Sequence, residues 1–451
     1  MTAAHPYPPG FVWGVATSAY QIEGAANEDG RGPSIWDIFS HTPGRTANGD
    51  TGDVACDHYH RWRDDVELIA SLGVDAYRFS IAWPRVQPLG QGAWNEQGLA
   101  FYDRLVDALL ARGIKPHATL YHWDLPQALQ DQGGWQNRET AQRFADYAAQ
   151  VARRLGDRLG SIATHNEPWC TATLGHLVGK FAPGIQDAQI AAQVSHHLLL
   201  SHGLALQAMR AVGTRAPLGI VLNQSSVTAA TDSEADRQKA EREYALFVRW
   251  YMDPIFKGRY PTAPGVSVYP AVHDNDFKVI GQKLDFLGIN YYTRIWASSE
   301  GLPPPKPHGE SDMGWENWPQ GLTELLVGLK RQYGELPPIY VTENGIACAD
   351  RLEGGRVADA QRIEYMRSHL AALRAAMAEG VDVRGFFYWS LLDNFEWDSG
   401  YDKRFGLVHV DYASQRRTLK DSAHWYHGHI DAARAATLNA QRPAPALAGG
   451  L

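Results

Sequence analysis

Short apolar runs alternate along the chain with longer stretches in which apolar residues recur three and four positions apart. The short runs, which end in polar or aromatic residues, predict strands, whereas the longer stretches have the period of helices. The predicted strands are residues 11–17, 74–81, 115–122, 162–166, 218–223, 286–292, 338–343 and 384–390, and the clearest helices are 101–111, 140–154, 190–212 and 359–379. Eight such alternations predict an α/β chain folded as a (β/α)8 TIM barrel.

The segments between the predicted strands differ in length. Long ones follow the first, sixth and eighth strands, at residues 24–53, 298–320 and 393–412, and we expect these loops on the C-terminal face of the strands. Asn95 marks a helix start before 101–111, and Gly380 marks a helix end after 359–379. We expect residues 1–451 to form a single barrel domain with loose termini at 1–10 and about 432–451, a tail rich in Ala, Pro and Gly.

The composition is that of a soluble globular protein, with 44% hydrophobic and 20% charged residues in a chain of 451. The net charge is −8 and no long basic run occurs, so we expect neither nucleic acid nor an anionic membrane as a partner. Cys56, Cys170 and Cys348 form no CxxC pair, which argues against a disulfide framework and favours a reducing compartment. The start has no basic and apolar leader and no apolar stretch approaches about 18 residues, so we expect a cytoplasmic protein.

Two glutamates stand where predicted strands end. Glu167 follows the strand 162–166, and Glu343 closes the strand 338–343. Because the C-terminal ends of parallel barrel strands open onto one face, these two carboxylates can flank a single substrate bond. The other strand ends carry Gln21 and Glu23, Arg78, His122-Trp123-Asp124, Asn290-Tyr291-Tyr292 and Trp389. Paired carboxylates among amides, imidazoles and indoles are suited to the hydrolysis of a glycoside.

Three motifs carry a resemblance to a known family. They are Phe11-Val12-Trp13-Gly14-Val15-Ala16-Thr17-Ser18-Ala19-Tyr20-Gln21-Ile22-Glu23-Gly24 near the start, Asn166-Glu167-Pro168, and Val341-Thr342-Glu343-Asn344-Gly345. With them, the chain from residue 11 to about 427 resembles the β-glucosidases of glycoside hydrolase family 1. The resemblance is specific because all three motifs occur together in one chain.

The resemblance implies a role for each matching residue. Glu343 would be the nucleophile and Glu167 the acid/base, with Arg78 and Tyr292 bonded to the nucleophilic carboxylate. The implied sugar contacts are Gln21, His122, Trp123, Asn166, Trp389, Glu396 and Trp397. Trp169 and Trp315 would wall the leaving-group side, or aglycone side, of the site.

The implied reaction is hydrolysis of terminal β-D-glucosidic bonds in small oligosaccharides or in aryl and alkyl β-glucosides. We expect the two carboxyl groups to lie about 5 Å apart, the separation that allows a covalent glycosyl-enzyme and retention of configuration. Some β-galactosidase, β-fucosidase and transglycosylation activity is expected as well. The substrates are small β-glycosides, no cofactor motif occurs, and a homo-oligomer is compatible with the sequence.

Other readings of the same residues stay open. The chain could be a sugar-binding barrel without turnover, or an enzyme that mainly transfers its glycosyl group to an alcohol. Arg78 and His122 could be satisfied core residues, and Trp169 and Trp315 could be packing residues. Pairs such as His196-His197 suggest metal ligands, but no Cys/His spacing closes a site and we expect no metal.

Overall fold

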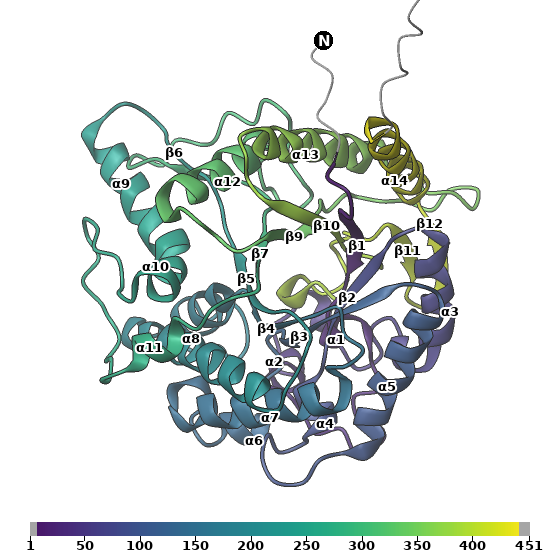
Figure 1. The fold of residues 1–451 in the computed structure, drawn as a ribbon, viewed down its shortest axis with the longest axis horizontal. Coiled ribbons are helices and arrows are strands. Elements are labelled where there is room, and N and C mark those ends of the chain that lie inside the picture. The colour runs from purple at the N-terminus through teal and green to yellow at the C-terminus, as the bar shows by residue number, and fades with distance from the viewer. Residues whose placement is uncertain (1–6, 442–451) are drawn as a thin grey trace, which may run out of the picture.

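Eight parallel strands close into a barrel in the computed structural model, which describes residues 7–441. The strands lie in the order β1-β10-β9-β7-β5-β4-β3-β2, and β10 returns to pair with β1 (Figure 1). Their bounds are β1 Val12–Ala16, β2 Ala76–Ser80, β3 Lys115–Tyr121, β4 Ser161–Asn166, β5 Leu218–Asn223, β7 Phe286–Asn290, β9 Ile339–Asn344 and β10 Val383–Trp389. All eight predicted strands, and the TIM-barrel fold class, are confirmed.

Helices form a ring around the strands (Figure 1). They are α1 Ala19–Ile22, α2 Ile35–Ser40, α3 His58–Ser71, α4 Trp83–Val86, α5 Glu96–Ala111, α6 Gln127–Gln130, α7 Glu139–Leu155, α8 Ala188–Ala211, α9 Glu234–Tyr244, α10 Trp250–Lys257, α11 Asp276–Ile280, α12 Gln320–Tyr333, α13 Ala360–Ala378 and α14 Asp421–Ala440. Shorter or wider turns are η1 Ala47–Gly49, η2 Gly134–Gln136, η3 Cys170–Leu177, η4 Ala245–Arg249 and η5 Trp397–Ser399. The four predicted helices correspond to α5, α7, α8 and α13.

Burial explains why the strands could be recognised. Every residue of β2, β4 and β7 is buried, because the ring of helices covers the outer face of the barrel and side chains fill its interior. β7, with the sequence FLGIN, is apolar up to its last residue, whereas β4, with the sequence SIATHN, also buries polar side chains. Strands such as β5 and β7 therefore appear in the sequence as short apolar runs that stop at the polar rim.

The described part of each terminus differs from the prediction. The C-terminal tail was expected to be loose from about residue 432, but 432–440 complete α14, where Ala433 is buried, and 442–451 lie outside the described residues. At the N-terminus, Tyr7 is buried against Phe11 and Trp13, whereas 1–6 are not described. The apolar face of α14 was masked in the sequence by its high alanine content, and Tyr7 supplies the aromatic contact that orders its segment.

Two small sheets outside the barrel were not predicted. β6 (Val227–Ala229) pairs with β8 (Ile295–Ala297), and β11 (Val408–Asp411) pairs with β12 (Arg416–Leu419). All of these strands are three or four residues long. Each strand pairs with another short strand in a loop and not with a strand of the barrel. Strands this short leave no periodic pattern in the sequence.

A buried ion cluster fixes the long loop after β10. Lys420, which follows β12, donates to Asp393 over 2.6 Å, and Arg404 donates to the other oxygen of Asp393 over 2.7 Å. Lys420 and Asp393 are fully buried, so each charge depends on the others for compensation. Asn394 then donates to Ser390 over 2.9 Å. These contacts hold Asp393 and Asn394 in place on the C-terminal rim of the barrel, and so fix where the following residues of the loop begin.

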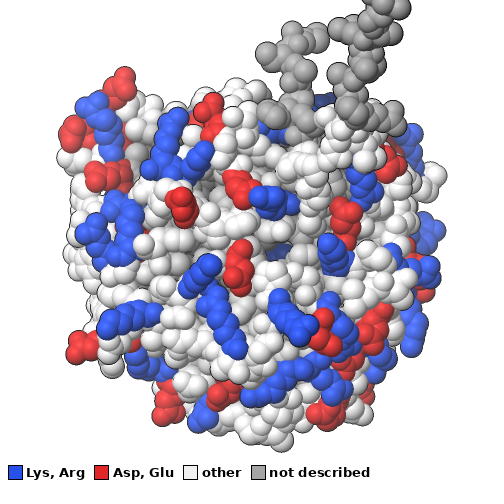
Figure 2. Space-filling model, in the orientation of Figure 1, with Lys and Arg blue, Asp and Glu red and all other residues white. Residues whose placement is uncertain are grey.

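The surface carries charges of both signs. Lys and Arg side chains are interspersed with Asp and Glu on the face seen in Figure 2. Within residues 7–441, no helix combines the length and the apolar character that crossing a membrane requires. Cys56, Cys170 and Cys348 are all buried and free.

Candidate active site

A cavity of about 320 Å³ opens at the C-terminal ends of the strands. Ten of the thirteen predicted site residues line it: His122, Trp123, Glu167, Trp169, Tyr292, Trp315, Glu343, Trp389, Glu396 and Trp397. The remaining three, Gln21, Arg78 and Asn166, lie behind its wall and hydrogen-bond to residues that line it. The structure therefore brings the whole predicted set together, although its members come from seven of the barrel strands and the loops that follow them.

Glu343 lies near the end of β9 and is held by two donors. Arg78, from β2, donates to one carboxyl oxygen over 2.7 Å, and the Tyr292 hydroxyl donates to the other over 2.6 Å. Burial raises the pKa of Glu343, while the positive charge of Arg78 and the hydrogen bonds from Arg78 and Tyr292 oppose that rise. These contacts are the ones predicted for Arg78 and Tyr292.

Glu167 follows β4 in a left-handed backbone conformation with φ of 49°. Its N–H donates to the Val221 carbonyl over 2.9 Å, which anchors this uncommon turn to the neighbouring strand. Asn290 donates to one carboxyl oxygen over 2.6 Å, and the Cys170 thiol lies 3.0 Å from the other. Burial and the negative charge of Glu343 raise the pKa of Glu167 to about 8.

The two carboxyl groups share a network of amides. Arg78 donates to the Asn166 side-chain oxygen over 2.7 Å, and Asn290 donates to the same oxygen over 3.0 Å. Thr342 in turn donates to the Asn290 oxygen over 2.7 Å, which orients the Asn290 amide so that its NH2 points at Glu167. Asn290 was not predicted as a site residue. Its position at the end of β7, two residues before Tyr292, is the sequence feature that could have identified it.

The far end of the cavity is built around Gln21 and Glu396. Gln21 donates to Asn394 over 3.0 Å, to the Phe395 carbonyl over 2.9 Å and to Glu396 over 3.5 Å. It thus joins the segment after β1 to the loop after β10. Burial and the charge of Glu343 raise the pKa of Glu396 to about 8. An amide and a carboxyl group side by side can donate to and accept from vicinal hydroxyls.

Aromatic rings close the cavity around His122. Its ring is stacked on Trp389 and Trp397, with ring centres 5.8 and 5.9 Å away, and burial lowers its pKa well below the ordinary value. His122 is therefore neutral, and its Nδ1 has no hydrogen-bond partner among the described residues. Trp123, with φ of 78°, donates through its indole to the Asn166 carbonyl over 2.8 Å. An indole wall of this kind suits the C–H face of a sugar ring.

Trp169 and Trp315 also line the cavity. Trp169 packs edge-on against Phe247, with 4.7 Å between the ring centres. Trp315 packs edge-on against Tyr292, with 5.6 Å between the ring centres. Trp315 keeps 37% of its surface exposed. A large aromatic side chain that lines a cavity and still faces solvent is placed to contact a group that extends out of it.

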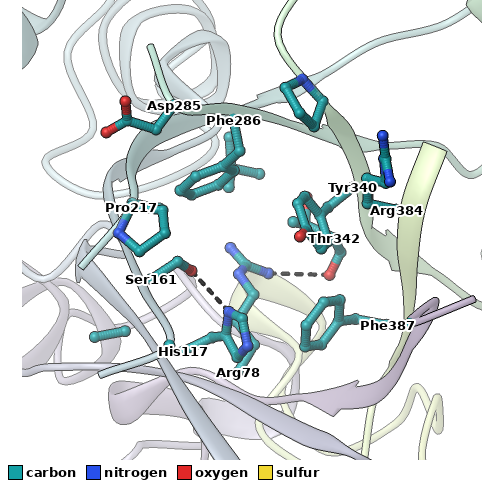
Figure 3. Close-up of a pocket in the computed structure, with 16 residues that line it drawn as sticks. Arg78, His117, Ser161, Pro217, Asp285, Phe286, Tyr340, Thr342, Arg384 and Phe387 are labelled. Carbon is teal, nitrogen blue, oxygen red and sulfur yellow. Dashed lines mark hydrogen bonds between the residues drawn. The ribbon is translucent and has the colours of Figure 1, made fainter. Parts of the chain in front are cut away.

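A second cavity, of about 340 Å³, lies among the N-terminal halves of the strands. Figure 3 shows Phe286, Phe387 and Tyr340 around it, with Arg78 at its centre. His117 Nδ1 and Ser161 Oγ are 2.7 Å apart on one side of it. Neither Glu167 nor Glu343 lines this cavity, but Arg78, which does, donates to Glu343.

The arrangement at the C-terminal face defines a class of protein. Two buried carboxyl groups, one held by a guanidinium and the other not, face a cavity lined by amides, a neutral imidazole and indoles. On a (β/α)8 barrel, this is the equipment of a glycoside hydrolase.

Comparisons with known proteins place the chain within that class. The sequence matches the family model for glycosyl hydrolase family 1 over residues 3–434. Beta-glucosidase A of Acetivibrio thermocellus is 46% identical over 93% of this chain and 97% of that relative. The bifunctional beta-D-glucosidase/beta-D-fucosidase of Bifidobacterium breve is 47% identical over 93% of this chain and 97% of that relative. The chain belongs to glycosyl hydrolase family 1.

The fold agrees with this assignment. The solved family 1 β-glucosidase from Thermotoga maritima is similar to this chain with a TM-score of 0.92 and 43% identity, over 96% of this chain and 99% of that one. A second solved structure, the complex of the virulence factor SghA with its substrate analog salicin, has a TM-score of 0.90 and 48% identity over 94% and 96%.

Proposed function

We propose that this protein is a retaining β-glucosidase that acts through a covalent glycosyl-enzyme. The observation that carries the proposal is the unequal treatment of the two carboxyl groups. Glu343 contacts the Arg78 guanidinium, whereas Glu167 is bonded only to uncharged groups and faces the charge of Glu343. A single proton shared by the pair therefore resides on Glu167, and Glu343 is left as the anion.

In the first half of the reaction, Glu343 attacks the anomeric carbon and Glu167 delivers its proton to the departing glycosidic oxygen. The Asn290 and Cys170 contacts hold the Glu167 carboxyl group, so the proton is presented in a fixed direction. Arg78 and Tyr292 bind the two oxygens of Glu343, which aligns the attacking carboxylate.

In the second half, the negative charge of Glu343 is lost into the new ester bond. The pKa of Glu167 then falls, because one of the two causes that raised it is gone. Glu167, now ionised, takes a proton from water, and the water attacks the anomeric carbon from the side that the leaving group vacated. The ester bond to Glu343 breaks in the same step, which returns the Glu343 carboxylate and leaves the proton on Glu167 for the next cycle. Two displacements at the same carbon give a product with the β configuration of the substrate.

The substrate class follows from the cavity walls. Gln21, His122 and Glu396 serve the hydroxyls of a terminal sugar, with Trp389 and Trp397 against its C–H face. The β-glucosidase names of the similar chains favour glucose, and the bifunctional relative makes β-fucosides reasonable secondary substrates. Trp169 and Trp315 would shield an acceptor alcohol, so some transglycosylation is part of the proposal. We further propose that the chain acts in the cytoplasm as a single catalytic domain.

The proposal is tested by following hydrolysis of an aryl β-glucoside by absorbance and by proton NMR. We expect release of the phenol and, within the first turnovers, a β-anomer signal that later decays as the sugar mutarotates. Initial appearance of the α-anomer would rule out double displacement. Binding without phenol release would favour a sugar-binding barrel instead.

A further inference from the structure

The Cys170 thiol makes a contact with Glu167 that the reaction described above does not require. Cys170 begins η3, three residues after Glu167, and its N–H donates to the Glu167 carbonyl over 2.9 Å. That turn places Sγ 3.0 Å from the carboxyl oxygen Oε2 of Glu167. Because Asn290 occupies the other oxygen, Oε1, each oxygen of Glu167 has one protein donor.

The thiol is a donor in this contact. Burial raises the pKa of Cys170 well above the ordinary value of a thiol, and the charges of Glu167 and Glu343 raise it further, so the sulfur keeps its proton. The side-chain amide of Asn223, at the end of β5, points its nitrogen at the same sulfur over 3.8 Å. The acceptor side of the sulfur therefore faces Asn223, and its proton is directed to Glu167.

We propose that Cys170 is a positioning residue for Glu167: its S–H···O bond fixes the direction of the carboxyl group and stabilises the ionised form that remains after proton delivery. The inference rests on the acid/base role proposed for Glu167. Cys170 would then be the second uncharged hydrogen-bond donor to the Glu167 carboxyl group, beside Asn290. From the sequence alone, Cys170 could only be described as a cysteine outside any disulfide framework.

The proposal predicts a specific change in pH dependence. A donor to a carboxylate favours its ionised form, so removing the donor raises the pKa of Glu167 and moves the alkaline limb of kcat/KM to higher pH. The other titratable and charged groups around Glu167 are Arg78 in β2, His122 after β3, Tyr292 after β7, Glu343 in β9 and Glu396 in the loop after β10. None of them is altered by a substitution at Cys170.

The experiment uses two matched pairs of variants in the full chain. Cys170→Thr and Cys170→Val have the same shape, and only threonine can donate; Cys170→Ser and Cys170→Ala form a smaller pair with the same contrast. The substrate is phenyl β-glucoside, whose poor leaving group makes the rate depend on the acid. For the valine and alanine variants, we expect the alkaline limb to rise by about half a pH unit to one pH unit above that of the threonine and serine variants.

Each outcome has a distinct meaning. Equal alkaline limbs within both pairs would overturn the positioning role, even if all variants were slower than the wild type, because a packing role moves rates without separating donors from non-donors. If thermal unfolding shows that the larger pair does not fold, the serine and alanine pair decides the question. Absence of turnover by the wild type would count against the proposed function and not against the role of Cys170.

Discussion

Replacing Glu343 by glutamine is expected to lower kcat for aryl and alkyl β-glucosides by about 10⁴-fold or more. The amide keeps the shape of the side chain, and its single oxygen can still accept from Arg78 while its NH2 donates to the Tyr292 hydroxyl, but it cannot form the ester with the anomeric carbon. Fold and sugar binding are therefore expected to survive. The measurements are steady-state rates, the thermal unfolding midpoint, and the affinity for glucose by calorimetry.

Asp398→Asn is the matched control for this substitution. Asp398 also lines the cavity, and its carboxylate pairs with Lys180 over 3.2 Å, away from Arg78. Removing that charge is expected to change kcat by less than about tenfold, because Asp398 takes no part in bond formation. Similar losses in both variants would mean that cavity charge, and not a nucleophile at Glu343, governs the rate.

Replacing Glu167 by glutamine is expected to give a loss that depends on the leaving group. For an alkyl β-glucoside, whose alkoxide leaves only with a proton, kcat/KM should fall by about 10³- to 10⁴-fold. For a dinitrophenyl β-glucoside, which needs no protonation on departure, the first half-reaction should be within about tenfold of the wild type. The measurement is kcat/KM across a series of phenols of increasing acidity.

The slope of that series provides the internal control. The wild type is expected to show little dependence of log kcat/KM on the acidity of the phenol, and the variant a steep one. A uniform loss across the series would mean that Glu167 is not the acid, and that its carboxyl group supports the site in another way, for example through Asn290.

Much of the architecture could be predicted because buried strands leave a recognisable pattern in the sequence. Most residues of the barrel strands are buried, so strands such as β5 and β7 appear as short apolar runs that end at the rim. Glu167 and Glu343 stand out in the sequence because a carboxylate directly after such a run has to lie on the C-terminal face. The same reasoning placed His122 and Trp389, whose rings stack on each other in the wall of the cavity.

What could not be predicted depends on contacts between distant segments. Asn290 and Cys170 are ordinary residues in the sequence, and only the folded chain shows that both donate to Glu167. The start of α5 illustrates the same limit. Asn95 stands at its N-terminus as predicted, but its side chain bonds the carbonyls of Asp29 and Arg85 instead of capping the helix. The local sequence pattern therefore predicted where the helix begins, whereas contacts with distant segments determine which groups the Asn95 side chain binds.

The central claim is that Glu343 and Glu167 act on one acetal through a glycosyl-enzyme. It is tested most directly by incubating the protein with an activated β-glucoside that carries fluorine at C2. The fluorine slows both displacements, and the activated leaving group keeps the first one fast enough for the glycosyl-enzyme to accumulate. The account predicts a mass increase of one fluoroglucosyl group per chain, located by peptide mapping on Glu343. No increase in a protein that hydrolyses ordinary β-glucosides, or a label on Glu167, would contradict it.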